Sequence, residues 1–234
     1  MYWMFLFSAL IVAYVSGSVN FAIIISTFLG KGDIRTMGNL KPGTANIGRN
    51  LGRGWGTVVF FGDVAKVVVP LIIAEEVYFN IETYEGTAAL MLIAMAAILG
   101  HRKPLFFGFK GGGGLATTIG AFAFFGLIEL SIAMLVGAGA GMLLFGKREY
   151  RFGRWVAMLI ILLTPVTHLV CALIIERPLA GALHFGGRNW PLIAAVAILS
   201  MYVFLSNMGT ILQTINSQRV KDSSASPVDH SQDT

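Results

Sequence analysis

Six apolar stretches, separated by polar loops, dominate the pattern of hydrophobic and polar positions along this chain. They lie at residues 2–29, 55–74, 86–99, 115–145, 155–175 and 190–212. A helix needs roughly 20 apolar residues to cross the hydrocarbon core of a bilayer, and the stretches at 2–29, 55–74, 155–175 and 190–212 each suit one such helix. The stretch at 86–99 is shorter but uniformly apolar. The pattern therefore predicts an all-α, polytopic membrane protein.

The stretch at 115–145 fits either one long helix or two short helices that fold back near residues 128–131. Its only charged residue is Glu129. Cytoplasmic loops of membrane proteins are enriched in Lys and Arg, and only two passes bring all three basic loops to one side. These loops lie at residues 31–53, 101–110 and 147–154. We therefore predict about seven transmembrane helices, with the N-terminus outside and the C-terminus cytoplasmic.

The composition agrees with this interpretation. Hydrophobic residues make up 56% of the chain and charged residues 12%, whereas ordinary soluble domains carry about 25% charged residues. The basic loops account for the net charge of +5, and no basic run with interleaved aromatic residues indicates a nucleic-acid partner. We expect one membrane domain at residues 1–216 and a disordered cytoplasmic tail, rich in Ser, Asp and Gln, at 217–234. The oligomeric state stays open.

The first basic loop combines many glycines with cationic and small polar side chains. Glycine allows a close approach of the backbone to a ligand, and cationic and amide groups bind anions. The side chains of interest are Arg35, Lys41, Thr44, Asn46, Arg49 and Arg53. The alternative is a basic loop that only fixes the topology of the protein.

The second basic loop ends in a run of glycines directly before an apolar stretch. These glycines are Gly111, Gly112, Gly113 and Gly114. Successive backbone N–H groups at the N-terminus of a helix favour an anion, and Lys110 would stand beside it. The spacing does not match a Walker-type phosphate loop, because no Gly-Lys-Ser/Thr follows. A flexible hinge between two spans is the alternative.

Three ionisable residues near the membrane are candidates for chemistry. His101, at the membrane boundary, is a candidate general base for a hydroxyl substrate, and a structural capping role is its alternative. Asp63 and Lys66 lie at i and i+3 within one span, where mutual pairing lowers the cost of burying each charge. No histidine pair has the spacing of metal ligands, so we predict no metal site.

Several segments of the first half of the chain match motifs of one family. They read Gly-Ser-Val-Asn-Phe-Ala from residue 17, Asp-Ile-Arg from residue 33, Gly-Thr-Ala-Asn-Ile-Gly-Arg-Asn-Leu-Gly from residue 43, and Gly-Asp-Val-Ala-Lys from residue 62. The most specific is Gly-His-Arg-Lys-Pro-Leu-Phe-Phe-Gly-Phe-Lys-Gly-Gly from residue 100. Together they resemble the bacterial acyl-phosphate:glycerol-3-phosphate acyltransferases, the PlsY family.

The resemblance implies transfer of a fatty acyl group from acyl phosphate to glycerol 3-phosphate. The product is lysophosphatidic acid, made for phospholipid synthesis at the bacterial plasma membrane without a metal or other cofactor. Both substrates carry phosphate, and the acyl chain of one can lie between helices, beside membrane lipids. By resemblance, the site is lined by Gly43, Asn46, Arg49, His101, Lys110, Gly111, Gly112, Gly113 and Gly114.

The chain also departs from the motifs of this family. Where the first motif usually reads Gly-Ser-Gly-Asn, this chain has Gly38, Asn39, Leu40 and Lys41. Gly113 stands in place of a second lysine, a loss for which Lys41 is a hypothetical compensation. The third motif, with His, Asn and Arg, is not recognisable at 205–217, where Asn207 and Asn216 are its only candidate remnants.

These departures keep two other functions open. The first is a divergent relative that retains the fold and an anion site but acts on another lipid or phosphorylated substrate, or catalyses nothing. The second is a transporter or channel, which has less support because the spans contain few acidic or basic residues that carry a charge. These are Asp63, Lys66 and Glu129.

Overall fold

The computed structural model describes residues 1–145, 149–174 and 190–224, and within these ranges the chain is helical without strands. The α-helices in chain order are α1 (Tyr2–Ser18), α2 (Phe21–Phe28), α3 (Thr44–Asn50), α4 (Arg53–Val77), α5 (Tyr84–Arg102), α6 (Leu115–Phe125), α7 (Leu127–Phe145), α8 (Glu149–Ile174) and α9 (Trp190–Ser224). Two 3₁₀ turns, η1 (Ile34–Thr36) and η2 (Leu105–Phe107), lie in the loops. The prediction of an all-α fold is confirmed.

Five helical segments are long and apolar enough to cross a membrane. They are Tyr2–Phe28, Arg53–Val77, Tyr84–Phe107, Val156–Ile174 and Trp190–Gly209. Two shorter apolar helices, Leu115–Phe125 and Leu127–Leu143, complete the set. The chain is thus a polytopic membrane protein with the seven apolar helical segments that the pattern predicts, while its orientation in the membrane stays a prediction.

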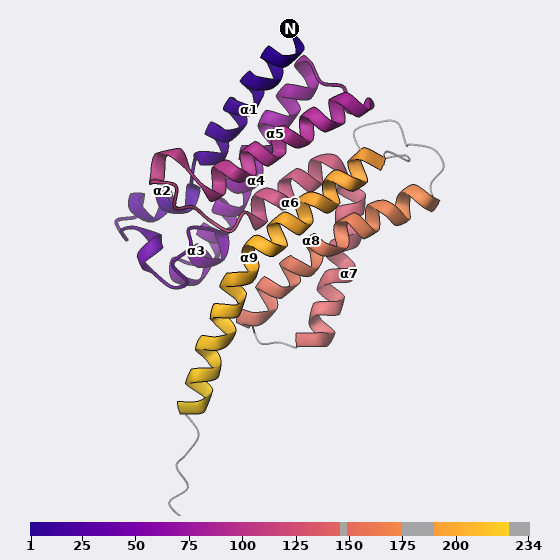
Figure 1. The fold of residues 1–234 in the computed structure, drawn as a ribbon. Coiled ribbons are helices and arrows are strands. Elements are labelled where there is room, and N and C mark those ends of the chain that lie inside the picture. Colours follow the sequence, from indigo (N-terminus) through magenta and orange to yellow (C-terminus); the bar gives the residue numbers. More distant parts are fainter. Residues whose placement is uncertain (146–148, 175–189, 225–234) are drawn as a thin grey trace, which may run out of the picture.

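The long stretch at 115–145 is divided at Gly126, slightly before the position near 128–131 that we expected. Helix α6 ends at Phe125, and α7 turns back from the break and packs along α8 (Figure 1). A side chain at Gly126 would collide with atoms of His168 and Glu129. The break therefore falls on the one residue of this turn that leaves room for both side chains.

The first apolar stretch is also interrupted. After α1 ends at Ser18, Asn20 caps the start of α2, and its side-chain Oδ1 accepts a hydrogen bond from the N–H of Ile23 at 3.1 Å. An Asn cap of this kind satisfies one of the free N–H groups at a helix start. The interruption also leaves the carbonyl of Val19 free to accept a hydrogen bond from Lys66 of α4.

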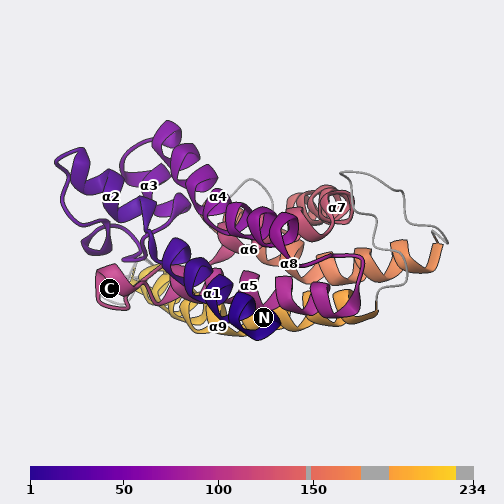
Figure 2. The ribbon, with the colours of Figure 1, turned by 90° about the horizontal axis from the view of Figure 1, so that it is seen from above.

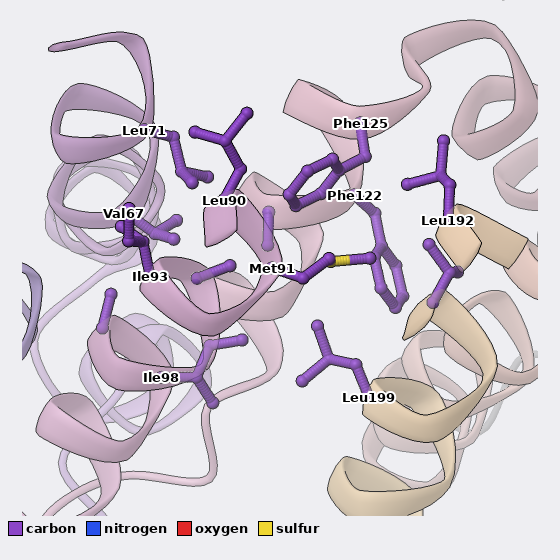
Figure 3. Close-up of a cluster of buried hydrophobic side chains, with 14 of the residues drawn as sticks. Val67, Leu71, Leu90, Met91, Ile93, Ile98, Phe122, Phe125, Leu192 and Leu199 are labelled. Carbon is purple, nitrogen blue, oxygen red and sulfur yellow. The ribbon is translucent and has the colours of Figure 1, made fainter. Parts of the chain in front are cut away.

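The hydrophobic core lies where α4, α5, α6 and α9 face one another (Figure 3). The buried side chains at its centre include Val67, Leu71, Leu90, Met91, Ile93, Ile98, Phe122, Phe125, Leu192 and Leu199. Helix α1 packs closely against α5, because Gly17 and Gly100 lack side chains that would overlap the facing backbone. Helices α2 and α3 lie together at one end of the molecule (Figure 2). The core fixes the helix ends that surround the candidate site.

Helix α9 continues to Ser224, beyond the predicted domain boundary at residue 216. The first part of the segment that we expected to be a disordered tail is thus helical. The remainder, residues 225–234, lies outside the described residues.

Candidate active site

The two basic loops are joined by Arg35. Its Nη1 donates to the carbonyl of Phe107 at 2.8 Å and to that of Lys110 at 3.4 Å. Asp33 holds the guanidinium from the other side, with 2.6 Å between its Oδ2 and Nη2 of Arg35. Hydrogen bonds from Arg35 also keep the pKa of Asp33 below its usual value. The loops predicted to bind phosphate therefore lie side by side.

The first loop is folded around the buried side chain of Asn46. The amide Nδ2 of Asn46 donates to three carbonyls of the loop, those of Ile34, Met37 and Lys41. Its Oδ1 accepts from the side chain of Asn50 at 2.8 Å. A loop that crosses between helices carries polar backbone groups that must be paired when buried, and Asn46 pairs several of them at once. Asn46 therefore shapes the loop as well as lining the cleft that it borders.

The glycine run of the second loop divides into two halves. The N–H groups of Gly111 and Gly112 donate to the carbonyls of Arg102 and His101, each at 3.2 Å. They are thus used to fold the loop back on the end of α5. Gly113 and Gly114, directly before α6, line the cleft. Of the four N–H groups expected to bind an anion, those of Gly111 and Gly112 are used within the loop, and those of Gly113 and Gly114 lie at the start of α6.

The carbonyl of Gly113 is held by two side chains from different helices. Arg102 donates to it from Nη1 at 2.9 Å, and Asn207 of α9 donates from Nδ2 at 3.0 Å. Arg102 is itself held over the ring of Tyr202, 5.4 Å from the ring centroid. Because the C=O and the following N–H point in opposite directions across a trans peptide, the N–H of Gly114 points away from these two donors.

A cleft of about 290 Å³ opens between these loops and the helices. Its polar side chains are Asn39, Lys41, Thr44, Asn46, Arg49, Asp63, His101 and Asn207. Its apolar wall comes from α4, α6 and α8 and comprises Phe60, Leu115, Ala116, Ile119 and Ala157. Pro42, Ala45 and three glycines complete the lining. One cleft thus presents cationic and amide groups beside an apolar surface.

Asp63, Lys66 and His101 form a buried cluster at the base of this cleft. The Nζ of Lys66 lies 2.8 Å from Oδ1 of Asp63 and 2.6 Å from Nδ1 of His101, and donates to the carbonyl of Val19 at 3.1 Å. The side chains of Asp63 and Lys66 are 3% and 2% exposed. Buried charges persist where they are paired. Lys66 is paired with Asp63 by charge and is hydrogen-bonded to His101 and to the carbonyl of Val19.

Most of the residues expected at the site come together in the cleft. Those that line it are Lys41, Gly43, Asn46, Arg49, His101, Gly113 and Gly114, with Asp63 of the intramembrane pair. Lys110, Gly111, Gly112 and Lys66 do not line it. A side chain at Gly112 would nevertheless overlap the ring of His101. The carbonyl of Lys110 accepts a hydrogen bond from Arg35 of the first loop.

The sequence carried only a weak signal for the two side chains that hold the carbonyl of Gly113, Asn207 and Arg102. Asn207 was one of two candidate remnants of a lost motif, and the structure brings it against Gly113. The side chain of the other, Asn216, lies outside the described residues. Arg102 carried no expectation beyond its charge. Asn207 is the single amide of the apolar span Trp190–Gly209, and this is the signal that marks it, since a polar group inside a membrane needs a partner.

Together, fold and cleft define an integral membrane protein with a glycine-rich, cationic site open to an apolar wall. Residues 7–214 match the family described as glycerol-3-phosphate acyltransferase. This match covers most of the chain, and the chain belongs to that family.

Individual relatives agree with this assignment. The glycerol-3-phosphate acyltransferases of Neisseria meningitidis serogroup C (strain 053442) and Aquifex aeolicus (strain VF5) are 38% and 40% identical to the chain over 117 and 110 residues. These matches cover 50% and 47% of the chain and 58% and 54% of the relatives. The chain thus spans little more than half the length of the curated relatives that it matches.

Solved structures of one protein are similar over a longer range. They are crystal structures of PlsY (YgiH), described as an integral membrane glycerol 3-phosphate acyltransferase, in its glycerol 3-phosphate and lysophosphatidic acid forms. The TM-scores are 0.67 and 0.60, with sequence identities of 27% and 26%. Each comparison covers 89% of this chain and 92% of the other.

Proposed function

We propose that this protein transfers a fatty acyl group from acyl phosphate to glycerol 3-phosphate and so produces lysophosphatidic acid for phospholipid synthesis. The family and the relatives named glycerol-3-phosphate acyltransferase support this activity. The crystal forms of PlsY named for glycerol 3-phosphate and lysophosphatidic acid support the acceptor and the product. We place the reaction at the cytoplasmic face of a bacterial plasma membrane.

The observation that carries the proposal is the two-sided lining of the cleft. Lys41, Arg49 and the N-terminus of α6 offer positive charge to phosphate groups. Phe60 and Ile119 offer an apolar surface on which an acyl chain can lie. A substrate with an anionic head and a long apolar tail needs both surfaces within one site.

The reaction is balanced without a metal or cofactor. The hydroxyl oxygen of glycerol 3-phosphate forms a bond to the acyl carbon, and the bond between that carbon and the phosphate oxygen breaks. Inorganic phosphate leaves and carries away the hydroxyl proton. Positioning two substrates and stabilising their charge are then the main tasks of the protein. We assign these tasks to the cleft residues together with Lys110 and the glycine run.

The experiment is a transfer assay with purified protein in lipid nanodiscs. Acyl phosphate and radiolabelled glycerol 3-phosphate should give labelled lysophosphatidic acid, and acyl-CoA in place of acyl phosphate should give none. Arg49→Gln should lower kcat/KM, whereas Lys103→Gln, at an exposed cation outside the cleft, should not. A folded protein that forms no product from acyl phosphate would overturn the proposal.

One observation favours a different acceptor or donor as the second candidate. The position of the family's second lysine is Gly113, and a side chain there would overlap the amide of Asn207. A cation lost at this point weakens binding of a phosphate group. Under this alternative, a hydroxyl acceptor without phosphate, such as glycerol, would be acylated with a kcat/KM at least equal to that for glycerol 3-phosphate. A strong preference for glycerol 3-phosphate would exclude it.

A further inference from the structure

His101 faces two environments with its two ring nitrogens. Nδ1 points into the buried cluster on α4, and Nε2 points toward Gly112, where an added side chain would overlap it. His101 is only 3% exposed, yet it lines the cleft. Which nitrogen carries the proton of the neutral ring decides whether the cleft meets a base or a hydrogen-bond donor.

Two neighbours compete for Nδ1, and they require opposite tautomers. Oδ1 of Asp63 lies 3.5 Å from Nδ1, and a hydrogen bond to it would place the proton on Nδ1 and leave Nε2 free as a base. Nζ of Lys66 lies 2.6 Å from the same nitrogen, and an ammonium can only donate. A contact of 2.6 Å is a strong hydrogen bond, whereas 3.5 Å is at the limit of one. The contact with Lys66 therefore decides the tautomer of His101 and leaves Nδ1 without a proton.

The surroundings of Lys66 support the same assignment. Its ammonium has three protons and three acceptors at short range: Asp63, His101 and the carbonyl of Val19. The charges of Asp63 and Lys66 cancel, so a neutral imidazole keeps the buried cluster neutral. A proton on Nδ1 would point directly at the ammonium, where two donors would repel each other.

We propose that Lys66 fixes His101 as the tautomer protonated at Nε2, so that His101 presents a hydrogen-bond donor, and not a general base, to oxygen atoms of the substrates. Lys66 is then a positioning residue, which acts through His101 without lining the cleft. Asp63 holds the ammonium in place. This assignment rests on the proposed acyl transfer, in which a phosphate oxygen or the carbonyl oxygen of the acyl group accepts the hydrogen bond.

The decisive measurement is the tautomer itself, which needs no turnover. The protein, labelled with ¹⁵N-histidine and held in nanodiscs, contains four histidines, and the signals of His101 are those missing from His101→Gln. We expect an unprotonated Nδ1 and a protonated Nε2. A protonated Nδ1, in a neutral or charged ring, would overturn the inference even if the protein transfers acyl groups normally. Lys66→Met should shift the ring toward the tautomer protonated at Nδ1.

Kinetics then test the consequence for catalysis. His101→Gln keeps an N–H donor near the position of Nε2 but has no basic group, whereas His101→Phe keeps the ring shape without a donor. A donor role predicts at least tenfold higher kcat/KM for the Gln variant than for the Phe variant, and equal loss in both would contradict it. A rise in KM identifies phosphate as the acceptor of the hydrogen bond, whereas a fall in kcat alone identifies the acyl oxyanion.

Discussion

Two buried clusters of ionisable side chains lie in the part of the membrane domain that the structure describes, and they differ in how their charges are paired. In the cluster of Asp63, Lys66 and His101, the ammonium contacts an acceptor on three sides. The other cluster contains Glu129 of α7 and His168 of α8, which are 1% and 3% exposed. Oε2 of Glu129 and Nε2 of His168 have no hydrogen-bond partner among the described residues. Oδ1 of Asp63 has no hydrogen bond of good geometry either, but it lies 2.8 Å from the ammonium of Lys66 and is paired by charge.

The second cluster lies at the break between α6 and α7. A Cβ atom added at Gly126 would lie 2.5 Å from Nε2 of His168 and 2.6 Å from Oε2 of Glu129, so both atoms face one small space. The other ring nitrogen of His168 lies 2.9 Å from the carbonyl of Thr164. None of these residues lines the cleft.

The difference between the two clusters shows which buried polar side chains of the membrane domain belong to the candidate site. A buried polar group without a partner costs free energy, whereas a paired group recovers most of that cost. The cluster beside the cleft is paired and adjoins the loops, as a functional site requires. In the cluster at Gly126, Oε2 of Glu129 and Nε2 of His168 have no hydrogen-bond partner among the described residues. Variants of Lys66 and Glu129 should break this contrast, and variants of Arg102 and Asp33 should show how far the loops beside the first cluster depend on their own polar contacts.

Lys66→Met should produce the largest effect, because it leaves Asp63 as an unpaired buried charge. Breaking a buried ion pair from one side costs about 3–5 kcal/mol, measured here as the free energy of unfolding in mixed micelles. The double variant Asp63→Asn, Lys66→Met removes both charges and should recover most of this loss. A loss below about 1 kcal/mol for Lys66→Met would show that the cluster is not held by its charges.

Arg102→Met should lower activity by releasing the carbonyl of Gly113. Hydrogen bonds from a charged donor are worth about 1.5–3 kcal/mol, so kcat/KM for transfer to glycerol 3-phosphate should fall about 10- to 100-fold. Lys103→Met is the matched control, because it removes an exposed cation next in the sequence. Equal effects of the two variants would mean that Arg102 contributes only charge.

Glu129→Met should have the opposite sign from Lys66→Met. Oε2 of this buried carboxyl has no hydrogen-bond partner among the described residues, and replacing the carboxyl with an apolar side chain of similar size removes a cost of about 1–3 kcal/mol. The free energy of unfolding should therefore rise, and Glu129→Gln, which keeps a polar end, should gain less. Destabilisation by Glu129→Met would reveal a partner for this carboxyl and remove the contrast between the two clusters.

Asp33→Asn should have the smallest effect, because the ion pair with Arg35 is partly exposed, with 34% and 27% of the two side chains accessible. Such pairs contribute less than about 1 kcal/mol. The pKa of Asp33 is lower in the folded protein than in the unfolded one. The ion pair therefore contributes its full stability at a pH above the pKa of the unfolded protein, and this stability is lost as the pH falls through the pKa of the folded protein. Unfolding curves of the wild type and the variant should therefore converge in acid. A difference in stability between the two proteins that persists at acid pH would show that Asp33 acts through the conformation of the loop and not through its charge.

The sequence predicted the elements well because their signals are local. Apolar length identified the helical spans, and the charges of the loops divided the stretch at 115–145 into two helices. The position of that break was missed, because it depends on how Gly126 meets His168 of another helix. The extension of α9 past residue 216 was missed too, because polar composition does not exclude a helix that continues an apolar one.

The amino-acid sequence alone determined the membrane class, the number of apolar helices and the two glycine-rich, cationic loops, since each follows from residues close together in the chain. Only the tertiary structure decided which groups meet. It brought Asn207 against Gly113, joined the loops through Arg35, and set Lys66 closer than Asp63 to the ring of His101. These contacts join residues of different helices and loops, and the packing of those elements sets their distances.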